Sequence, residues 1–250
     1  MKRTLPPDPF RFGWRYVQQI GPDGSKQSVQ VPLTPEDLLH PQEGDKIVEG
    51  TQQSRDRNYL YSVLQWRLAD NPHTVVFSDC LIDWGVPDLG NHAPDISIFE
   101  NVDNPQRNWK TFRVAEEGAR PVLAIEIVSP DAHDRRVRDN DVVTKVREYY
   151  RAGVPLYVLV DQEREEDPRQ VMGYRRGARK YLRMRPDRQG RLLLEPVRLL
   201  LGLKDERAVC WDADSGEEIG DLTAMAQALH EAQARIRELE AKLRRNGSQH

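Results

Sequence analysis

A glutamate stands in the middle of an otherwise apolar stretch of the chain. Glu126 interrupts the run from 122 to 128, whose other residues are all valine, leucine, isoleucine or alanine. Such a run is typical of a strand that is buried on both faces. Moving an ionised carboxylate out of water costs several kcal/mol unless a proton, a cation or a metal ion compensates it. Glu126 is therefore a candidate functional residue.

Two further residues suggest a chemistry for this glutamate. Asp95 opens a second strand-like run, and Lys145 follows on a stretch with helical periodicity. Two carboxylates on paired strands could share one divalent ion, and oxygen ligands suit Mg²⁺ or Mn²⁺. A nearby ammonium could position a water molecule or offset charge on a phosphoryl group. We therefore predict Asp95, Glu126 and Lys145 as catalytic residues, although Lys145 could instead simply neutralise Glu126 or pair with Asp141.

A third acidic residue extends the predicted metal site. Asp79 lies on the strand-like run from 75 to 82, and we take it as a metal ligand beside Asp95 and Glu126. Asp83, on the same face of that run, has the pattern of an ordinary edge carboxylate. No GxSxG elbow and no glycine-rich phosphate loop occur in the sequence, so a serine hydrolase or a nucleotide-binding loop is not expected.

The elements that must position these residues follow from hydrophobic periodicity. An amphipathic helix is predicted over about 55–69, with Tyr59, Val63 and Trp66 inward. Strands are predicted over 75–82, 95–99 and 122–128, then a helix over 141–152 that Gly153 and Pro155 close, and a strand over 156–160. The short strands after 161 are expected to add to the sheet in antiparallel fashion.

The two ends of the chain have patterns of their own. Residues 1–30 predict a peripheral hairpin around the turn Gly21-Pro22-Asp23-Gly24. Residues 220–246 predict a helix whose apolar side chains recur in steps of three and four, as in a coiled coil. We expect this helix to form a homodimer, and the alternative is that it docks on its own domain. The apolar positions are Leu222, Met225, Leu229, Ala232, Ile236, Leu239 and Leu243.

Composition limits the classes of protein to consider. The chain has 250 residues, of which 38% are hydrophobic, and 37 Lys and Arg oppose 40 Asp and Glu. General electrostatic steering toward nucleic acid is therefore not expected. Local basic runs at 135–138 and 175–180 could bind DNA or be solvated turns. Cys80 and Cys210 lack zinc-ligand spacing. No signal peptide or membrane span is apparent, so a cytoplasmic protein is expected.

The ordered set of residues resembles a known group of enzymes. Pro94-Asp95 followed by Glu126-Ile127-Val128 resembles the PD-(D/E)XK nuclease superfamily, with valine where lysine is expected. The longer set is similar to the bacterial Uma-two family of restriction-endonuclease-like proteins, over roughly residues 30–215. It comprises Pro32 to Leu39, Glu126 to Pro130, Asp141, Lys145 and Tyr149, and Ala152 to Asp161. Family members commonly carry a histidine early in the first long helix, where this chain has Gln53-Ser54-Arg55-Asp56.

This resemblance implies a fold and an activity. The fold is α/β (α+β), a restriction-endonuclease-like core of mixed β-sheet flanked by helices over residues 31–215, with Lys145 taking the place of the missing lysine. The activity is Mg²⁺- or Mn²⁺-dependent hydrolysis of phosphodiester bonds in DNA. Two alternatives remain: a catalytically inactive nuclease-like binding or assembly module that dimerises through its C-terminal helix, and a hydrolase of a small phosphorylated molecule.

Overall fold

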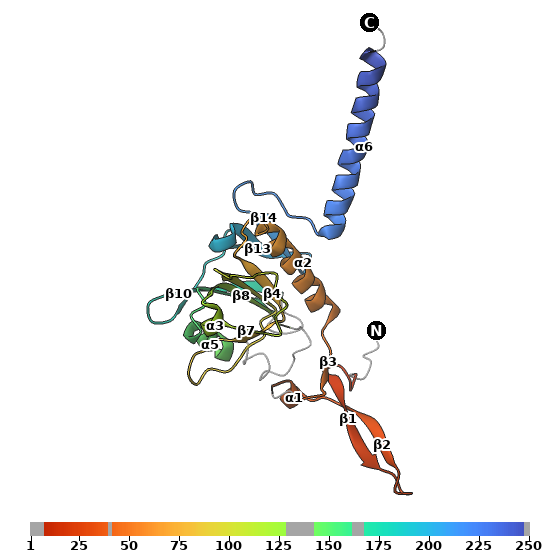
Figure 1. Cartoon of the computed structure of the whole chain (residues 1–250), viewed down its shortest axis with the longest axis vertical. Coiled ribbons are helices and arrows are strands. Elements are labelled where there is room, and N and C mark those ends of the chain that lie inside the picture. The colour runs from red at the N-terminus through yellow and green to blue at the C-terminus, as the bar shows by residue number, and fades with distance from the viewer. Residues whose placement is uncertain (1–7, 40–41, 129–142, 162–167, 248–250) are drawn as a thin grey trace.

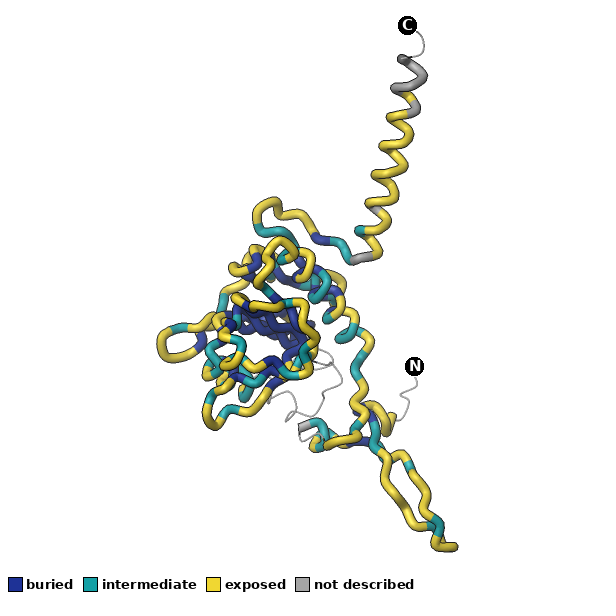
Figure 2. Tube along the Cα trace, in the orientation of Figure 1, coloured by how far each residue is buried: buried dark blue, intermediate teal, exposed yellow. Residues whose placement is uncertain are grey.

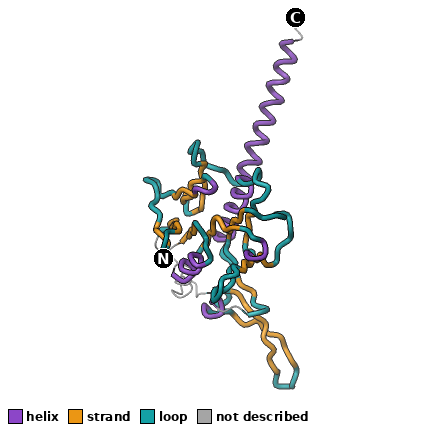
Figure 3. Tube along the Cα trace, turned by 60° about the vertical axis from the view of Figure 1, so that its left-hand side comes forward, coloured by secondary structure: helices purple, strands orange, loops and turns teal. Residues whose placement is uncertain are grey.

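A central body carries two projections in this computed structural model, which describes residues 8–39, 42–128, 143–161 and 168–247 (Figure 1). An N-terminal hairpin and the C-terminal helix extend from the body in opposite directions, and the turned view in Figure 3 shows both standing clear of it. In the described part of the chain, no helix is both long and apolar enough to cross a bilayer.

The body is built on a six-stranded mixed sheet with the order β11-β10-β9-β8-β6-β4. The two central strands, β8 and β9, run parallel, and the other neighbours are antiparallel. This arrangement confirms the predicted mixed sheet. The strands are β4 (Val75–Ser78), β6 (Ile96–Glu100), β8 (Arg120–Ile127), β9 (Leu156–Asp161), β10 (Gln170–Arg176) and β11 (Tyr181–Arg183).

Helices cover the two faces of this sheet. The strands at the centre of the body are buried, as their dark blue colour in Figure 2 shows. The helix α2 (Thr51–Arg67) packs on one face through Tyr59, Leu60, Val63 and Leu64. The short helix α5 (Lys145–Arg151) packs on the other face. The prediction that Trp66 points inward was wrong, because that side chain is 57% exposed. Leu60 and Leu64 complete the buried stripe of α2 instead.

The first strand-like run is divided in two. β4 ends at Ser78, and β5 (Leu81–Asp83) pairs in parallel with β7 (Thr111–Arg113) in a separate small sheet, followed by α3 (Val114–Glu117). Between them Asp79 has a φ of 52°, a left-handed conformation that aspartate tolerates better than most residues. Its amide donates to the carbonyls of Pro94 and Asp95. Asp79 therefore lies at a bend beside β6, not on a continuous strand.

The strands after residue 183 form their own sheet, whereas we expected all the late strands to extend the main one. β12 (Leu192–Leu194), the turn η2 (Glu195–Val197), β13 (Leu199–Lys204) and β14 (Arg207–Asp212) follow in order. Only β10 and β11 continue the central sheet. The small sheet covers the same face as α2, because Leu192, Leu194 and Leu201 join the cluster that contains Leu60 and Leu64.

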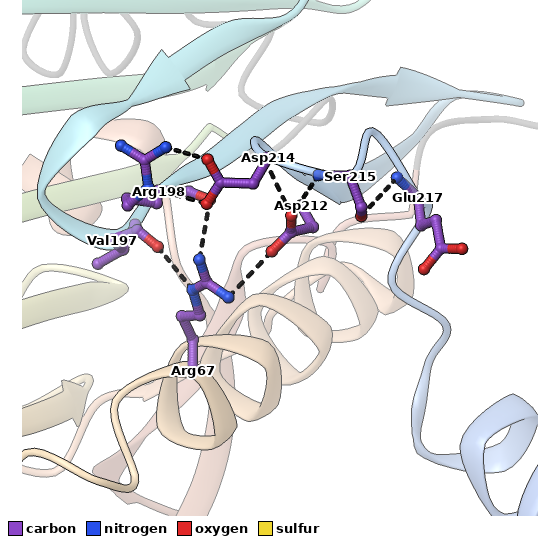
Figure 4. Close-up of polar contacts among 7 residues, drawn as sticks. All are labelled: Arg67, Val197, Arg198, Asp212, Asp214, Ser215 and Glu217. Atoms are coloured by element: carbon purple, nitrogen blue, oxygen red, sulfur yellow. Dashed lines mark hydrogen bonds and ion pairs between the residues drawn. The ribbon is translucent and has the colours of Figure 1, made fainter.

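Polar contacts attach the end of α2 to this small sheet (Figure 4). Arg67 Nε donates to the Val197 carbonyl at 2.9 Å, and Arg67 Nη1 lies 3.0 Å from Asp212 Oδ2. The other carboxylate oxygen of Asp212 accepts the amides of Asp214 and Ser215. One guanidinium thus connects the helix, the η2 turn and the end of β14.

The N-terminal segment confirms the predicted hairpin. β1 (Gly13–Ile20) pairs antiparallel with β2 (Lys26–Pro32), and β3 (Lys46–Ile47) adds a short third strand. α1 (Pro35–Leu39) follows, with Thr34 and Asp37 exchanging hydrogen bonds as in a capping box.

The C-terminal helix α6 (Leu222–Gly247) is present as predicted, and it does not pack along the body. Among the described side chains of α6, Met225 near its start is the one that packs against the core. Leu229, Ile236 and Leu239 are 60%, 55% and 52% exposed, and most of the described helix beyond its start is yellow in Figure 2. Docking on its own domain is therefore not what α6 does here. The side chains of Leu222 and Leu243 lie outside the described residues.

Candidate active site

Pairing of β6 with β8 brings the two predicted catalytic carboxylates together where β6 begins and β8 ends. Ile96 is registered with Ile125, so Asp95, directly before β6, and Glu126 lie at the same level. Asp95 Oδ2 accepts the amide of Ile127 at 2.8 Å. The predicted pairing of these strands is thus present, and backbone geometry anchors Asp95 beside the residue that follows Glu126.

Glu126 is held by two residues from one face of α5. Lys145 Nζ lies 3.1 Å from Glu126 Oε1, and the Tyr149 hydroxyl donates to the same oxygen at 2.7 Å. Lys145 and Tyr149 are four residues apart, a spacing that places both side chains on one side of a helix. The predicted lysine on the helix therefore does reach the predicted glutamate, whose side chain is only 7% exposed.

The aromatic ring of Tyr149 packs α5 against the sheet. The residue is fully buried, and its ring lies 4.7 Å from that of Tyr157 and 5.8 Å from that of Trp84, measured between centroids. The tyrosine thus anchors the helix on the sheet with its ring and orients Glu126 with its hydroxyl.

Asp95 is buried with incomplete compensation of its charge. Burial raises the pKa of its carboxyl to about 6, although the Ile127 amide and the positive charges of Lys145 and Arg57 each act to lower it. Arg57 Nη1 lies 3.6 Å from Asp95 Oδ1, beyond the distance of a good hydrogen bond. The favourable effect of Arg57 and Lys145 on the ionised form of Asp95 is therefore smaller than the unfavourable effect of burying its charge.

Arg57 is a member of this site that we did not predict. Its guanidinium contacts Glu49 at 2.7 Å and approaches Asp95 and Asp79 at 3.6 and 3.9 Å. It comes directly after the segment 53–56, in the first half of α2. One signal was available in the sequence, because Arg57 precedes Leu60 and Leu64 by three and seven residues and so lies near the buried face of α2.

A second unpredicted group supports α5 from behind. Trp84 Nε1 donates to His92 Nδ1 at 2.8 Å, so the ring proton of neutral His92 is on Nε2, which lies 2.7 Å from Glu148 Oε2. Burial lowers the pKa of His92, although Glu148 acts to raise it. The imidazole also lies 5.0 Å from the Tyr149 ring. His92 comes from an irregular segment rich in Pro, Gly and Asn, and no periodic pattern marks it.

Asp79 is less closely involved than the other predicted ligands. Its side chain is 66% exposed and lies near Arg57. Within the described residues, no three His, Cys, Asp or Glu side chains are grouped so that they could hold a metal ion. Asp79 is therefore not brought into one ligand set with Asp95 and Glu126, and its role as a ligand stays a prediction.

The donor chemistry at the site suits one kind of ion. Mg²⁺ prefers oxygen ligands, keeps several of its waters and is commonly held by only one or two carboxylates. Asp95 and Glu126 supply such a pair at one edge of the sheet. Thiolate or imidazole ligands for softer metals are not part of this group.

Acidic residues outnumber basic ones around Arg57 and Lys145. The carboxylates of Asp79, Asp95 and Glu126 are joined by that of Glu49, and partial burial raises the pKa of Glu49. Among the described residues, four carboxylates therefore lie around two cations. Neighbouring carboxylates of this kind favour the binding of a cation.

Several predicted features fall elsewhere. Asp141, Ser129 and the basic run 135–138 lie outside the described residues. A cavity of about 600 Å³ between α2 and the start of α6 touches the acidic cluster only through Glu49. Its other lining residues include Trp66, Arg207 and Met225, so this cavity is not the centre of the chemistry.

One solved structure is similar to part of this chain. A crystal structure of a protein from Anabaena variabilis ATCC 29413, described as a putative nuclease belonging to DUF820, is similar to this chain at 19% identity and a TM-score of 0.39. The similarity covers 62% of this chain and 87% of that one. No curated protein matches the sequence.

A family model gives the assignment. Residues 44–208, well over half of the chain, match the Uma2 family, whose description is "Putative restriction endonuclease". The match spans α2, the central sheet and α5, and so includes each residue of the acidic cluster. The resemblance seen in the sequence is confirmed, and the chain belongs to the Uma2 family.

Proposed function

We propose that this protein is a Mg²⁺- or Mn²⁺-dependent endonuclease that hydrolyses phosphodiester bonds of DNA. The observation that carries the proposal is the contact of Lys145 with Glu126, beside Asp95, in a chain of a family described as restriction endonucleases. Two carboxylates can hold a metal ion that assists hydrolysis of a phosphodiester, and a lysine beside them can stabilise the charge that develops.

Asp95 and Glu126 would hold the metal ion. A divalent ion bound there supplies a Lewis acid, which lowers the pKa of a bound water and offsets charge on the scissile phosphate. Asp95 is suited to the role because its burial disfavours the ionised form until a cation arrives. Asp79, at the exposed side of Arg57, is proposed as an outer ligand.

Lys145 would position the attacking water. Its side chain is 21% exposed, and its ammonium lies 3.1 Å from Glu126 Oε1. An ammonium in this place donates a hydrogen bond to the water and stabilises negative charge that develops on the phosphate oxygens. Tyr149 keeps the Glu126 oxygen in place during this step.

A basic surface next to α5 supports DNA as the substrate. A cavity of about 510 Å³ is lined by Arg147, Arg179, Lys180 and Arg183 together with three tyrosines, and none of its described lining residues is acidic. Arg179 and Lys180 belong to the predicted basic run 175–180. Cations grouped in this way bind backbone phosphates.

The test is cleavage of plasmid and linear DNA in the presence of Mg²⁺ or Mn²⁺. Glu126→Gln and Lys145→Ala should each reduce the rate by about 100-fold or more, while the exposed Glu217→Gln should leave it unchanged. Circular dichroism and binding of Mn²⁺ measured by calorimetry separate loss of chemistry from loss of folding or of metal. Cleavage that survives in both site variants would falsify the assignment.

One observation favours the inactive module as a second candidate. Lys145 and Arg57 already neutralise part of the acidic cluster in the protein itself. That function would be supported if the protein binds DNA but does not cleave it with any divalent ion, and if Glu126→Gln leaves the binding unchanged. Turnover of small phosphate esters alone would point to a hydrolase of a phosphorylated small molecule.

We propose further that the protein is a homodimer joined through α6. The three exposed side chains Leu229, Ile236 and Leu239 form a stripe that a second copy of the helix would cover. Sedimentation velocity should show a concentration-dependent dimer for the natural chain and a monomer for the variant Ile236→Lys with Leu239→Lys. A dimer that persists in this variant would place the interface elsewhere.

A further inference from the structure

We infer that the two α6 helices pair in parallel and in register, so that both bodies lie at the same end of the coiled coil. This inference rests on the homodimer proposed above. In the heptad that the sequence defines, Leu229 and Ile236 occupy a positions, and Met225, Ala232 and Leu239 occupy d positions. The apolar stripe alone does not select an orientation, but the charges beside it do.

Two polar contacts are made within α6 itself. Lys242, at the g position after that of Arg235, has its Nζ 2.6 Å from Glu238 Oε1, and Gln227 donates to Glu231 at 3.1 Å. By contrast, Arg235 and Glu240, which flank the stripe at a g and an e position, take part in no salt bridge within the described part of the chain. These two charges are available to a partner.

A parallel dimer satisfies both of them. In that orientation a g residue faces the e residue of the next heptad on the other helix. Arg235 would therefore meet the partner's Glu240, and the two-fold symmetry provides the same attraction twice. Ala228, at the preceding g position, would face the partner's Gln233, which is uncharged, and Lys242, at the following g position, would face the partner's Gly247, so neither pair adds repulsion.

An antiparallel dimer satisfies neither. The register that stacks Ile236 on the partner's Ala232 and Leu229 on the partner's Leu239 brings the two g positions together. Arg235 then lies beside the partner's Arg235, which is repulsive. Shifting the register by one heptad sets Arg235 beside the partner's Ala228 and leaves both charges unpaired.

Orientation matters because the start of α6 is attached to the body. Asp221 Oδ1 accepts the amide of Ala224 at 2.9 Å, and Met225 packs against the core. A helix of 26 residues is about 39 Å long. Parallel pairing places both bodies, and both candidate sites, at one end, where they can reach one DNA duplex. Antiparallel pairing would hold them about a helix length apart.

Single-cysteine variants report the orientation directly. In a full-length chain carrying Cys80→Ser, the variant Leu239→Cys should form a covalent dimer under mild oxidation, because d positions face each other in a parallel coil. Cys210 is buried and should not interfere. The Leu229→Cys and Leu239→Cys chains can also be mixed, with one of them lengthened by a tag so that the products differ in size. In a parallel coil, the disulfide between position 229 of one chain and position 239 of the other should not be the preferred product. A preferred mixed product, or a dimer in which Leu239→Cys does not cross-link, would overturn the parallel arrangement.

Charge reversal gives an independent readout. Glu240→Arg should weaken the dimer roughly tenfold in sedimentation equilibrium, because two attractive pairs become repulsive. An equimolar mixture of Glu240→Arg and Arg235→Glu chains should recover the affinity. The double variant Glu238→Arg with Lys242→Glu reverses the pair that lies within one helix but keeps its attraction, so it is the matched control and should have little effect. An unchanged affinity for Glu240→Arg would also overturn the arrangement.

These measurements are separate from the catalytic proposal. The Glu126→Gln variant should dimerise like the natural chain, so loss of cleavage and loss of the dimer are scored independently. A natural chain that sediments as a monomer at every concentration would refute both the dimer and its orientation, and leave the proposed active site untouched.

Discussion

Two buried aspartates in this protein have very different surroundings. Asp56 on α2 pairs with Arg169 at 2.7 Å, both side chains are 1% exposed, and its other oxygen accepts the Ala208 amide. Asp95 accepts one amide, lies 3.6 Å from Arg57 and shares that guanidinium with Glu49 and Asp79. Asp56 has one cation to itself in a closed contact, whereas Asp95 shares cations that are partly in water.

The difference separates a structural ion pair from a candidate active site. Arg169 also donates to the Glu206 carbonyl, so the pair links α2 to β10 and β14 in the folded protein. At Asp95 the cations Arg57 and Lys145 are each 21% exposed, and burial of the carboxylate is not fully compensated. Burial of a charge alone therefore says little about function, but burial with incomplete compensation next to solvent is informative.

The largest effect on stability is expected at the closed pair. Arg169→Ala should lower the free energy of unfolding by about 3–5 kcal/mol, because it leaves the Asp56 carboxylate buried without its cation. Urea unfolding measures this value. The double variant Asp56→Leu with Arg169→Met should recover much of the loss, since it removes both charges. A small effect of Arg169→Ala would show that water reaches Asp56 and would weaken the comparison.

Removing the charge of Asp95 is expected to raise the free energy of unfolding at neutral pH, whereas Arg169→Ala lowers it. Its folded-state pKa of about 6 lies above the ordinary 3.8, so the folded protein prefers the protonated acid. This contribution to stability is complete below pH about 3.8 and is lost as the pH rises through 6, a fall of about 3 kcal/mol. Asp95→Asn keeps an acceptor for the Ile127 amide and should abolish that fall.

The measurement is urea unfolding from pH 4 to pH 7 without divalent ions, taken as the difference between the natural chain and Asp95→Asn. Added Mg²⁺ should restore stability to the natural chain at pH 7 and not to the variant, because only a bound ion shifts the folding equilibrium. A natural chain that is as stable as Asp95→Asn at pH 7 without Mg²⁺ would contradict the uncompensated charge.

An intermediate effect is expected for the hydroxyl that orients Glu126. Tyr149→Phe keeps the ring among Trp84 and Tyr157 but removes the 2.7 Å bond to the carboxylate. Loss of a hydrogen bond to a charged group should cost about 1.5–3 kcal/mol. Tyr181→Phe is the matched control, because its hydroxyl donates to the neutral Val154 carbonyl at 2.7 Å, and it should cost about 0.5–1.5 kcal/mol. Equal losses would mean that Glu126 is not ionised.

The smallest effect is expected at the half-exposed contact between α2 and the small sheet. Arg67 and Asp212 are 24% and 22% exposed, so Arg67→Ala should cost about 1 kcal/mol or less. Arg198→Ala, at a pair that is more than half exposed, should be nearly neutral. Thermal unfolding compares the two. A loss at Arg67 as large as that at Arg169 would show that exposure does not separate these ion pairs.

The sequence alone determined most of the elements and singled out Asp95, Glu126 and Lys145 as the candidate site. Periodicity of two and of 3.6 residues placed the central strands, α2 and α6, because each needs an apolar face of that period to be buried. Glu126 stood out because a charge inside an apolar strand needs compensation. Helical spacing of four then made Lys145 and Tyr149 a pair, and both contact Glu126.

Only the tertiary structure decided the rest of the site. Arg57 and His92 enter it from segments distant in sequence, and no local periodicity records which side chains long-range packing will bring together. The bend at Asp79 arises from amide bonds to Pro94 and Asp95, which form only when β4 and β6 pair. The separate sheet of β12 to β14 likewise follows from its packing on α2, because short apolar strands carry no information about which sheet they join.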